Sequence, residues 1–213
     1  MVSNKLKLNG DKTELMVLTS PRLRPKVELS TIQIGDCAIP SSPTMRNLGR
    51  WFDQAATMDE HVRFVCRICY FHLHNIAAIR DMLTREAAKK LIHAFISSRL
   101  DNCNSLLLNV PACMIQWLQH VQNTAARIVM MRNKRDSISE ILKQLHWLPV
   151  QHRITFKVLC ITHRCIYGSI PLYLSELVQP YSPSRQLPYG GRSFSVGAPR
   201  LWNELPMELR MCT

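Results

Sequence analysis

The sequence predicts a mostly α-helical protein with a small N-terminal β portion, an α+β chain in which helices dominate. Between residues 84 and 131, apolar side chains recur at three- and four-residue spacing in two runs, as they do in two amphipathic helices. Short alternating runs before residue 58 are typical of strands instead. We therefore expect strands and a hairpin in 1–57, a helical domain in 58–179, and a Pro/Gly/Ser-rich loop with a short docking helix in 180–213.

The N-terminal part contains three short segments with the features of strands. An apolar run, Leu15–Leu18, follows a turn at Asn9-Gly10-Asp11, and Gly35-Asp36 separates two alternating runs as the turn of a hairpin would. Arg46–Asp53 is predicted to be one further extended piece. Because isolated hairpins are only marginally stable in water, these strands need a partner layer.

The helical part begins with a predicted helix over 59–80, capped by Thr57 or Asp59. Thr84 is expected to cap the next helix, and Pro111 suits the first turn of the one after it. The polar residues of 101–109 favour a corner between these two helices. The positions expected to face the core are Val62, Cys66, Cys69, Leu73 and Ile76 in the first helix, Ala88, Leu91, Ile92, Phe95 and Ile96 in the second, and Met114, Leu118, Val121, Ala125 and Ile128 in the third.

The remaining elements are shorter. A basic turn at 133–136 precedes a short helix capped by Ser137, and Pro149 precedes a helix over 150–167 that Gly168 and Pro171 end. Residues after Pro180 have the composition of a linker. In 198–210 we expect one helical turn that docks Trp202 into the core.

Composition narrows the class of partner. The 213 residues carry a formal net charge of +12, and a field of that sign attracts polyanions. From Asn102 to Ser175 there are eight Lys/Arg and two acidic residues, so 8 − 2 = +6 lies in about a third of the chain. No run of about 18 apolar residues occurs, and no apolar signal segment begins the chain, so we expect an intracellular protein and no membrane partner.

Cofactor and metal motifs are weak. Cys66-x2-Cys69-x4-His74 matches half of a zinc knuckle, but Ile79 stands where the last cysteine belongs, and both cysteines fall on a helical apolar stripe. We interpret them as core thiols. His93 and His146 lie in apolar runs and are expected to be structural. No metal site, cofactor or catalytic residue is predicted.

Several segments carry a family resemblance: NLGRWFD, LIHAFISSRLDNCNSLL, LQHVQNTAARIV, LHWLPVQHRI and GGRSFSVGAPRLWNELP. Together they resemble the region C-terminal to the polymerase active site in reverse transcriptases of non-LTR (LINE-type) retrotransposons. The resemblance implies that 1–57 is the remnant of a palm subdomain, and that 58–179 is a thumb-like bundle. The Ala-Asp-Asp motif of the family does not occur, so we expect a protein truncated before the catalytic aspartates, without RNA-directed DNA polymerase activity alone.

The resemblance also implies roles for particular residues. A thumb contacts RNA or DNA through the sugar-phosphate backbone, so basic residues outside the apolar stripes are the predicted nucleic-acid contacts. These are Lys89, Lys90, Arg127, Arg132, Lys134, Arg135, Arg153 and Lys157. Leu48-Gly49 resembles the primer grip, and Lys12 a vestigial palm lysine. The alternatives are a helical protein-interaction fragment that self-associates through its exposed strand remnant, or the product of a decayed element with no selected role.

Overall fold

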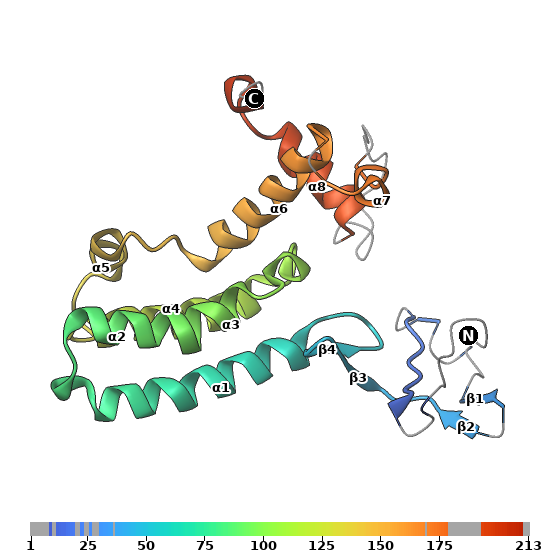
Figure 1. Ribbon diagram of the computed structural model, residues 1–213, viewed down its shortest axis with the longest axis horizontal. Helices are drawn as coiled ribbons and strands as arrows, with labels where there is room; N and C mark the ends of the chain where they lie inside the picture. The colour runs from blue at the N-terminus through green and yellow to red at the C-terminus, as the bar shows by residue number, and fades with distance from the viewer. Residues whose placement is uncertain are drawn as a thin grey trace. The chain divides into compact units, whose positions relative to one another are not determined.

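The computed structural model describes residues 9, 12–19, 22–23, 26, 30–35, 37–168, 170–178 and 193–210, and their ribbon is mostly helical (Figure 1). The chain divides into two compact units, Met1–Phe64 and Val65–Thr213. The strands belong to the first unit and most of the helices to the second. The predicted fold class, mostly α with a small N-terminal β portion, is confirmed.

The first unit contains two separate antiparallel hairpins among its described residues. β1 (Thr31–Ile34) pairs with β2 (Cys37–Pro40) in the register Thr31↔Pro40, which confirms the hairpin expected at Gly35. β3 (Thr44–Asn47) pairs with β4 (Arg50–Asp53) in the register Asn47↔Arg50. Arg46–Asp53 is therefore a hairpin and not one extended piece, because the chain reverses at Leu48-Gly49.

Of two other expectations for the first unit, one is wrong and one lies partly outside the described residues. Leu15–Leu18 forms no strand: Leu15 makes a single parallel bridge to Ser41, and the next three residues are irregular. The turn expected at Asn9-Gly10-Asp11 falls partly outside the described residues, although the Lys12 amide donates to the Asn9 carbonyl at 3.2 Å.

Asp53 organises the entry into α1 (Asp59–Ala78). One carboxylate oxygen accepts from the amides of Ala55 and Thr57, each at 3.0 Å, and the other from the Thr57 hydroxyl at 2.9 Å and the Met58 amide at 3.0 Å. Burial raises the pKa of Asp53, but these hydrogen bonds favour the charged form and lower the pKa overall. The Thr57 hydroxyl accepts from the Asp59 amide at 3.3 Å, so Thr57 takes part in the cap as expected, held by an aspartate that the sequence did not single out.

The second unit holds the helical core. After α1 come η4 (Arg80–Met82), α2 (Arg85–Ile92), a π-helical turn η5 (His93–Ser97) and α3 (Ser98–Asp101). The 3₁₀ turn η6 (Asn104–Leu107) then leads to α4 (Ala112–Met130), which Pro111 precedes. The Thr84 hydroxyl accepts from the Ala87 amide at 3.2 Å, so the predicted cap is confirmed.

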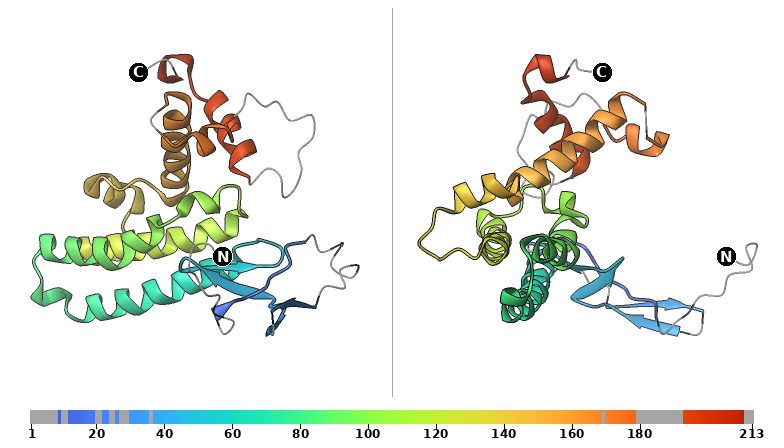
Figure 2. Two further views of the ribbon diagram at one scale, coloured as in Figure 1. Left: turned by 45° about the vertical axis from the view of Figure 1, so that its right-hand side comes forward. Right: turned by 60° about the vertical axis from the view of Figure 1, so that its left-hand side comes forward.

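The later helices follow as α5 (Ile138–Leu145), α6 (Val150–Ile166), α7 (Leu172–Ser175), α8 (Phe194–Asn203) and α9 (Met207–Arg210). α4 packs against α2, α5 and α6, and α6 packs against α8. The ribbons of α6 and α8 lie next to each other in Figures 1 and 2. The largest fully buried side chains include Leu73, Ile92, Ile96, Leu118, Ile154 and Val158. Most positions of the predicted stripes therefore lie in the core, but Cys66, Leu91 and Ile128 are half-buried, and Phe95 in the π-helical turn is 39% exposed.

Two further expectations need correction. Ser137 precedes α5, but its side chain makes no capping hydrogen bond. His93 and His146, which were expected to be structural, are both exposed; the His93 ring contacts the Trp147 ring, and His146 is the left-handed residue that follows α5. Residues 198–210 form parts of two helices and not one turn, with Pro199 inside α8, while the predicted linker over 180–192 lies outside the described residues.

No helix in the described part of the chain is long and apolar enough to cross a membrane.

Candidate nucleic-acid interface

The eight predicted contact residues lie in three places in the second unit. Lys89 and Lys90 are in the last turn of α2, and Arg153 and Lys157 are on the first two turns of α6. The remaining four lie at the C-terminal end of α4 or in the turn after it: Arg127, Arg132, Lys134 and Arg135. The structure thus brings together the basic turn that the sequence singled out, and separates it from the pair on α6.

Arg80 holds the end of α4 in place. Its guanidinium donates to the carbonyls of Ile128 and Val129, each at 2.8 Å, and to that of Leu83 at 2.7 Å. The last carbonyls of a helix have no partner within the helix and carry partial negative charge, so a cation satisfies both their bonding and their field. Arg80 is only 9% exposed, which makes it a structural cation and not a free phosphate ligand.

The α4 helix ends at Met131, which has a left-handed backbone with φ of 52°. The amide of Arg132 then donates back to the Arg127 carbonyl at 3.1 Å, so the chain reverses within one residue. This reversal places Arg132 and the turn expected at 133–136 directly beside the last turn of the helix, and we call residues 132–136 the basic turn.

Arg127 and Asp136 shape that turn. The Arg127 guanidinium donates to the carbonyl of Asn133 at 3.3 Å and to those of Lys134 and Asp136 at 3.4 Å each, while an Asp136 carboxylate oxygen accepts from the Asn133 amide at 3.1 Å. Arg127 is half-buried, whereas Arg132, Lys134 and Arg135 are exposed. Arg127 therefore acts on the turn, and the three exposed cations are left to face solvent.

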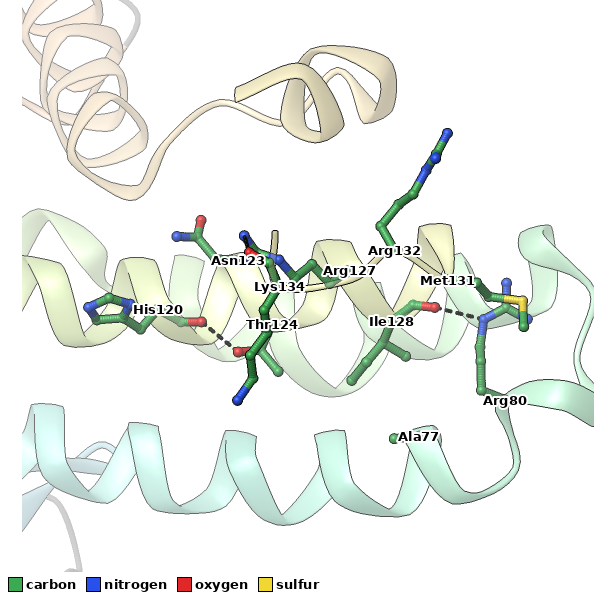
Figure 3. Close-up of a pocket in the computed structure, with 10 residues that line it drawn as sticks. All are labelled: Ala77, Arg80, His120, Asn123, Thr124, Arg127, Ile128, Met131, Arg132 and Lys134. Carbon is green, nitrogen blue, oxygen red and sulfur yellow. Dashed lines mark hydrogen bonds between the residues drawn. The ribbon is translucent and has the colours of Figure 1, made fainter. Parts of the chain in front are cut away.

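A hollow of about 660 Å³ lies along this end of α4, and we call it the basic groove. Its lining includes four basic residues and no acidic one: Arg80, Arg127, Arg132 and Lys134. His120, Asn123 and Thr124 lie within about one turn of α4 and add polar groups along one wall. Figure 3 shows Arg132 extending away from α1, and the two hydrogen bonds by which Thr124 and Arg80 are fixed to main-chain carbonyls of α4.

The two α6 residues lie in a different hollow, of about 470 Å³. Arg153 forms an ion pair with Asp101, the last residue of α3, while Lys157 is exposed at the same hollow. The exposed fraction of the Arg153 side chain is 21% and that of Asp101 is 40%. Arg153 therefore ties α6 to α3, and its charge is largely compensated by the carboxylate.

The residues implied by the family resemblance in the first unit form no site together. Lys12 is exposed, and its described contact is the main-chain bond to Asn9. Leu48 and Gly49 are the two turn residues of the β3–β4 hairpin, with φ of 47° and 80°, and Leu48 is 93% exposed. They stay predictions as vestiges of a palm.

In the cysteine motif, Cys69 lies in the core and Cys66 is half-buried. Burial raises the pKa of Cys66 to about 11, and burial together with the neighbouring Cys66 raises that of Cys69 to about 12. Both are therefore neutral thiols at pH 7, and His74 is exposed on the same helix. Within the part of the chain that the structure describes, no three His, Cys, Asp or Glu side chains gather as metal ligands would.

Sequence reasoning missed Arg80 and the polar wall of the groove. A signal for Arg80 was present, because it continues the stripe of Leu73 and Ile76 by four residues, and a charged residue on a buried stripe needs a partner. His120, Asn123 and Thr124 carried no such signal, since polar residues on the outer face of a helix are ordinary.

Comparison with models of known protein families, with curated proteins and with solved structures finds no match for this chain.

Proposed function

We propose that the basic groove binds the sugar-phosphate backbone of RNA or DNA, as part of a thumb-like module similar to that of non-LTR retrotransposon reverse transcriptases. The observation that carries the proposal is the lining of the groove, which includes four basic side chains and no acidic one. Two of the four, Arg80 and Arg127, hold the helix end and the turn. Arg132 and Lys134 can therefore meet phosphates at little cost in reorganisation.

The chemistry of the groove fits a backbone ligand. Exposed Arg and Lys neutralise phosphates and release their counterions, which favours binding without regard to base sequence. The amide of Asn123 and the imidazole of His120 are of the kind that hydrogen-bond phosphate or sugar oxygens beside such cations. Backbone contacts set position and carry no sequence information directly, so we expect binding that discriminates little between sequences.

The test is a binding isotherm for the full chain, measured by the fluorescence anisotropy of a labelled nucleic acid. The probes are a duplex, an RNA–DNA hybrid and a single strand. We expect affinity to fall as salt rises, with a slope of log K against log salt of roughly −2 to −3, because two or three phosphates are neutralised. Binding that does not change with salt, or no binding at about 50 mM salt, would contradict the proposal.

We further propose that the chain has no polymerase activity of its own. Two-metal nucleotidyl transfer uses closely placed carboxylates, and the sequence contains one adjacent acidic pair, Asp59-Glu60. Those residues begin α1, where Asp59 pairs with Arg63 at 2.6 Å. Primer extension with the purified protein and Mg²⁺ should incorporate nothing above a blank, and template-dependent incorporation would overturn this part of the proposal.

A second candidate, self-association, is favoured by the hairpins. The two described sheets have two strands each, so each strand has one edge whose main-chain groups are available for pairing. The exposed fraction of Ile34 in β1 is 42%, which adds apolar surface beside such an edge. Size-exclusion chromatography with light scattering tests this candidate, since a monomer at every concentration would argue against it and a concentration-dependent dimer would support it.

A further inference from the structure

The second hollow, at the start of α6, has features that backbone binding does not use, and we call it the α6 pocket. It shares no lining residue with the basic groove. Its walls come from η5, α3, η6, the segment between α5 and α6, and the start of α6. Its volume of about 470 Å³ falls in the range typical of sites for small organic ligands.

Two buried polar groups in the walls lack hydrogen-bond partners. Asn104 is 4% exposed and Trp147 is 9% exposed, and both line the pocket. Among the described residues, the Asn104 Oδ1 acceptor and the Trp147 Nε1 donor have no partner. A buried polar group without a partner loses its hydration and gains nothing, so each such group needs an explanation. Neither atom has appreciable accessible surface, so a ligand edge that offers both a donor and an acceptor would satisfy the pair only when the two side chains turn towards the pocket.

The charges of the pocket leave a single positive charge. With the lining histidines His93 and His146 counted as neutral, as in the formal net charge, Arg153 and Lys157 contribute two positive charges and Asp101 one negative charge, so 2 − 1 = +1. Lys157 is exposed and has no ion pair in the described part of the chain, while Arg153 is bound to Asp101. Each nucleotide of a strand carries one phosphate with one negative charge, which would neutralise this net charge of +1.

An aromatic side chain stands at the opening. Phe156 lines the pocket beside Lys157 and is 64% exposed, which is unusual for a phenylalanine in a folded protein. In single-strand binding sites, exposed aromatic rings next to cations serve as platforms on which bases stack. Duplex bases are already stacked and paired, so such a platform is useful only for an unpaired base.

We propose that the α6 pocket takes one unstacked nucleotide of single-stranded RNA or DNA: Phe156 stacks on the base, Lys157 meets its phosphate, and Asn104 and Trp147 bind the base edge. The proposal rests on the proposed function, since it assumes that the chain binds nucleic acid. It adds a preference for single strands over duplexes, which the basic groove alone does not provide. No covalent step is involved.

The pocket wall is held in place without a ligand. Gln122 on α4 donates to the Leu148 carbonyl at 2.9 Å, and the Gln119 side-chain oxygen accepts from the Val150 amide at 2.9 Å. These bonds fix the segment that carries Trp147, and the ring of His93 contacts the Trp147 ring edge-on with centroids 5.6 Å apart. A site that is ordered before binding loses less entropy when the ligand arrives.

The experiment compares the full chain with Phe156→Ala and Lys157→Gln, using a labelled single strand of about 12 nucleotides and a duplex of the same sequence. The matched control is Phe71→Ala, because Phe71 on α1 has the same exposed fraction, 64%, and does not line the pocket. We expect Phe156→Ala to weaken single-strand binding by about ten-fold and duplex binding by less than about two-fold. Phe71→Ala should leave both affinities unchanged.

The outcomes separate this inference from the proposed function. If the wild-type chain binds both probes and Phe156→Ala weakens neither, or both equally, the pocket assignment is wrong while backbone binding stands. If the wild-type chain binds neither probe, both fail. A downfield shift of the Trp147 indole proton on adding the single strand, absent with the duplex, would support the assignment independently of the variants. An indole proton that does not move with either probe would contradict it.

Discussion

The guanidinium of Arg80 donates a 2.8 Å hydrogen bond to the main-chain carbonyl of Ile128, across 48 positions of the sequence. This bond and a second one to the Val129 carbonyl anchor the end of α4 to η4, the turn between α1 and α2. A third bond, to the Leu83 carbonyl, holds the guanidinium in place. Because the basic turn follows α4 directly, the position of Arg132 and Lys134 depends on a residue that contacts no ligand.

Replacing Arg80 by methionine should destabilise the protein. The change leaves three buried or half-buried carbonyls without their charged donor, at a cost of about 3 kcal/mol. Thermal unfolding followed by circular dichroism should show a midpoint lowered by roughly 2–4 °C for each kcal/mol lost. The control is Arg85→Met, because Arg85 is exposed in the first turn of α2. Equal midpoints for the two variants would show that the hydrogen bonds of Arg80 do not stabilise the protein.

Gln122 should stabilise the folded protein for a similar reason, because it also satisfies a main-chain carbonyl. It is 1% exposed, and its side-chain amide is the donor for the Leu148 carbonyl at 2.9 Å. Gln122→Leu keeps the volume and removes the donor, so we expect a loss of about 1–3 kcal/mol in the free energy of unfolding measured by urea titration. Gln116→Leu, at an exposed position of the same helix, should change that free energy by less than about 0.5 kcal/mol.

Leu48 has a positive φ, which is unfavourable for leucine, and a residue that tolerates this conformation should stabilise the first unit. Leu48 and Gly49 both have positive φ, as in the type I′ turn that Asn-Gly pairs favour. Leu48→Asn should therefore raise the free energy of unfolding by about 0.5–1 kcal/mol, while Leu48→Val should lower it, because a β-branched residue resists this conformation. The order Val below Leu below Asn in denaturant titration is the expected result, and the reverse order would show that the strand is continuous there.

His61 should make the first unit sensitive to acid. Burial first, and then the neighbouring Arg50, lower the pKa of His61 from 6.5 to about 4. The Arg50 Nη1 and His61 Nε2 atoms are 3.0 Å apart in a buried position. Since the unfolded chain binds the proton near pH 6.5 and the folded chain only near pH 4, the stabilisation by neutral His61 is complete above pH 6.5 and is lost as the pH falls towards 4.

The measurement is the unfolding midpoint of the wild-type chain and of His61→Gln at about pH 7.5 and about pH 5. The wild type should lose on the order of 2 kcal/mol over this interval through His61, and His61→Gln should lose correspondingly less. His74→Gln, at an exposed position of the same helix, should keep the wild-type pH dependence. An unchanged pH dependence in His61→Gln would mean that His61 titrates normally.

What the sequence could predict was local. The Thr84 cap, the hairpin at Gly35 and the buried stripe of Leu118, Val121 and Ala125 depend on residues a few positions apart, and the structure contains all three. Leu48 misled the prediction because leucine seldom adopts positive φ, so nothing marked a turn there. The extent of α8 was missed for a different reason, since a proline usually ends a helix and Pro199 lies inside α8, next to the buried small residues Gly197 and Ala198.

The candidate site was predictable only in part. Charge alone located Arg132, Lys134 and Arg135, because a cluster in the sequence stays a cluster when the chain turns between helices. The pairing of Arg153 with Asp101 and the hydrogen bond from Arg80 to Ile128 join residues about 50 positions apart, and no local pattern encodes such partners. For that reason the sequence predicts Arg153 as a phosphate contact, whereas in the structure the ion pair with Asp101 compensates much of its charge.

The most direct test of nucleic-acid binding at the basic groove compares the salt dependence of two triple variants. One replaces Arg132, Lys134 and Arg135 by glutamine, and the other replaces Arg85, Arg99 and Arg164, three exposed arginines outside the groove, so that both lose the same charge. We predict that the slope of log K against log salt for a labelled duplex shrinks by about 2 in the first variant and by less than about 1 in the second. Equal slopes in the two variants would contradict the account, because the binding would then follow net charge and not the groove.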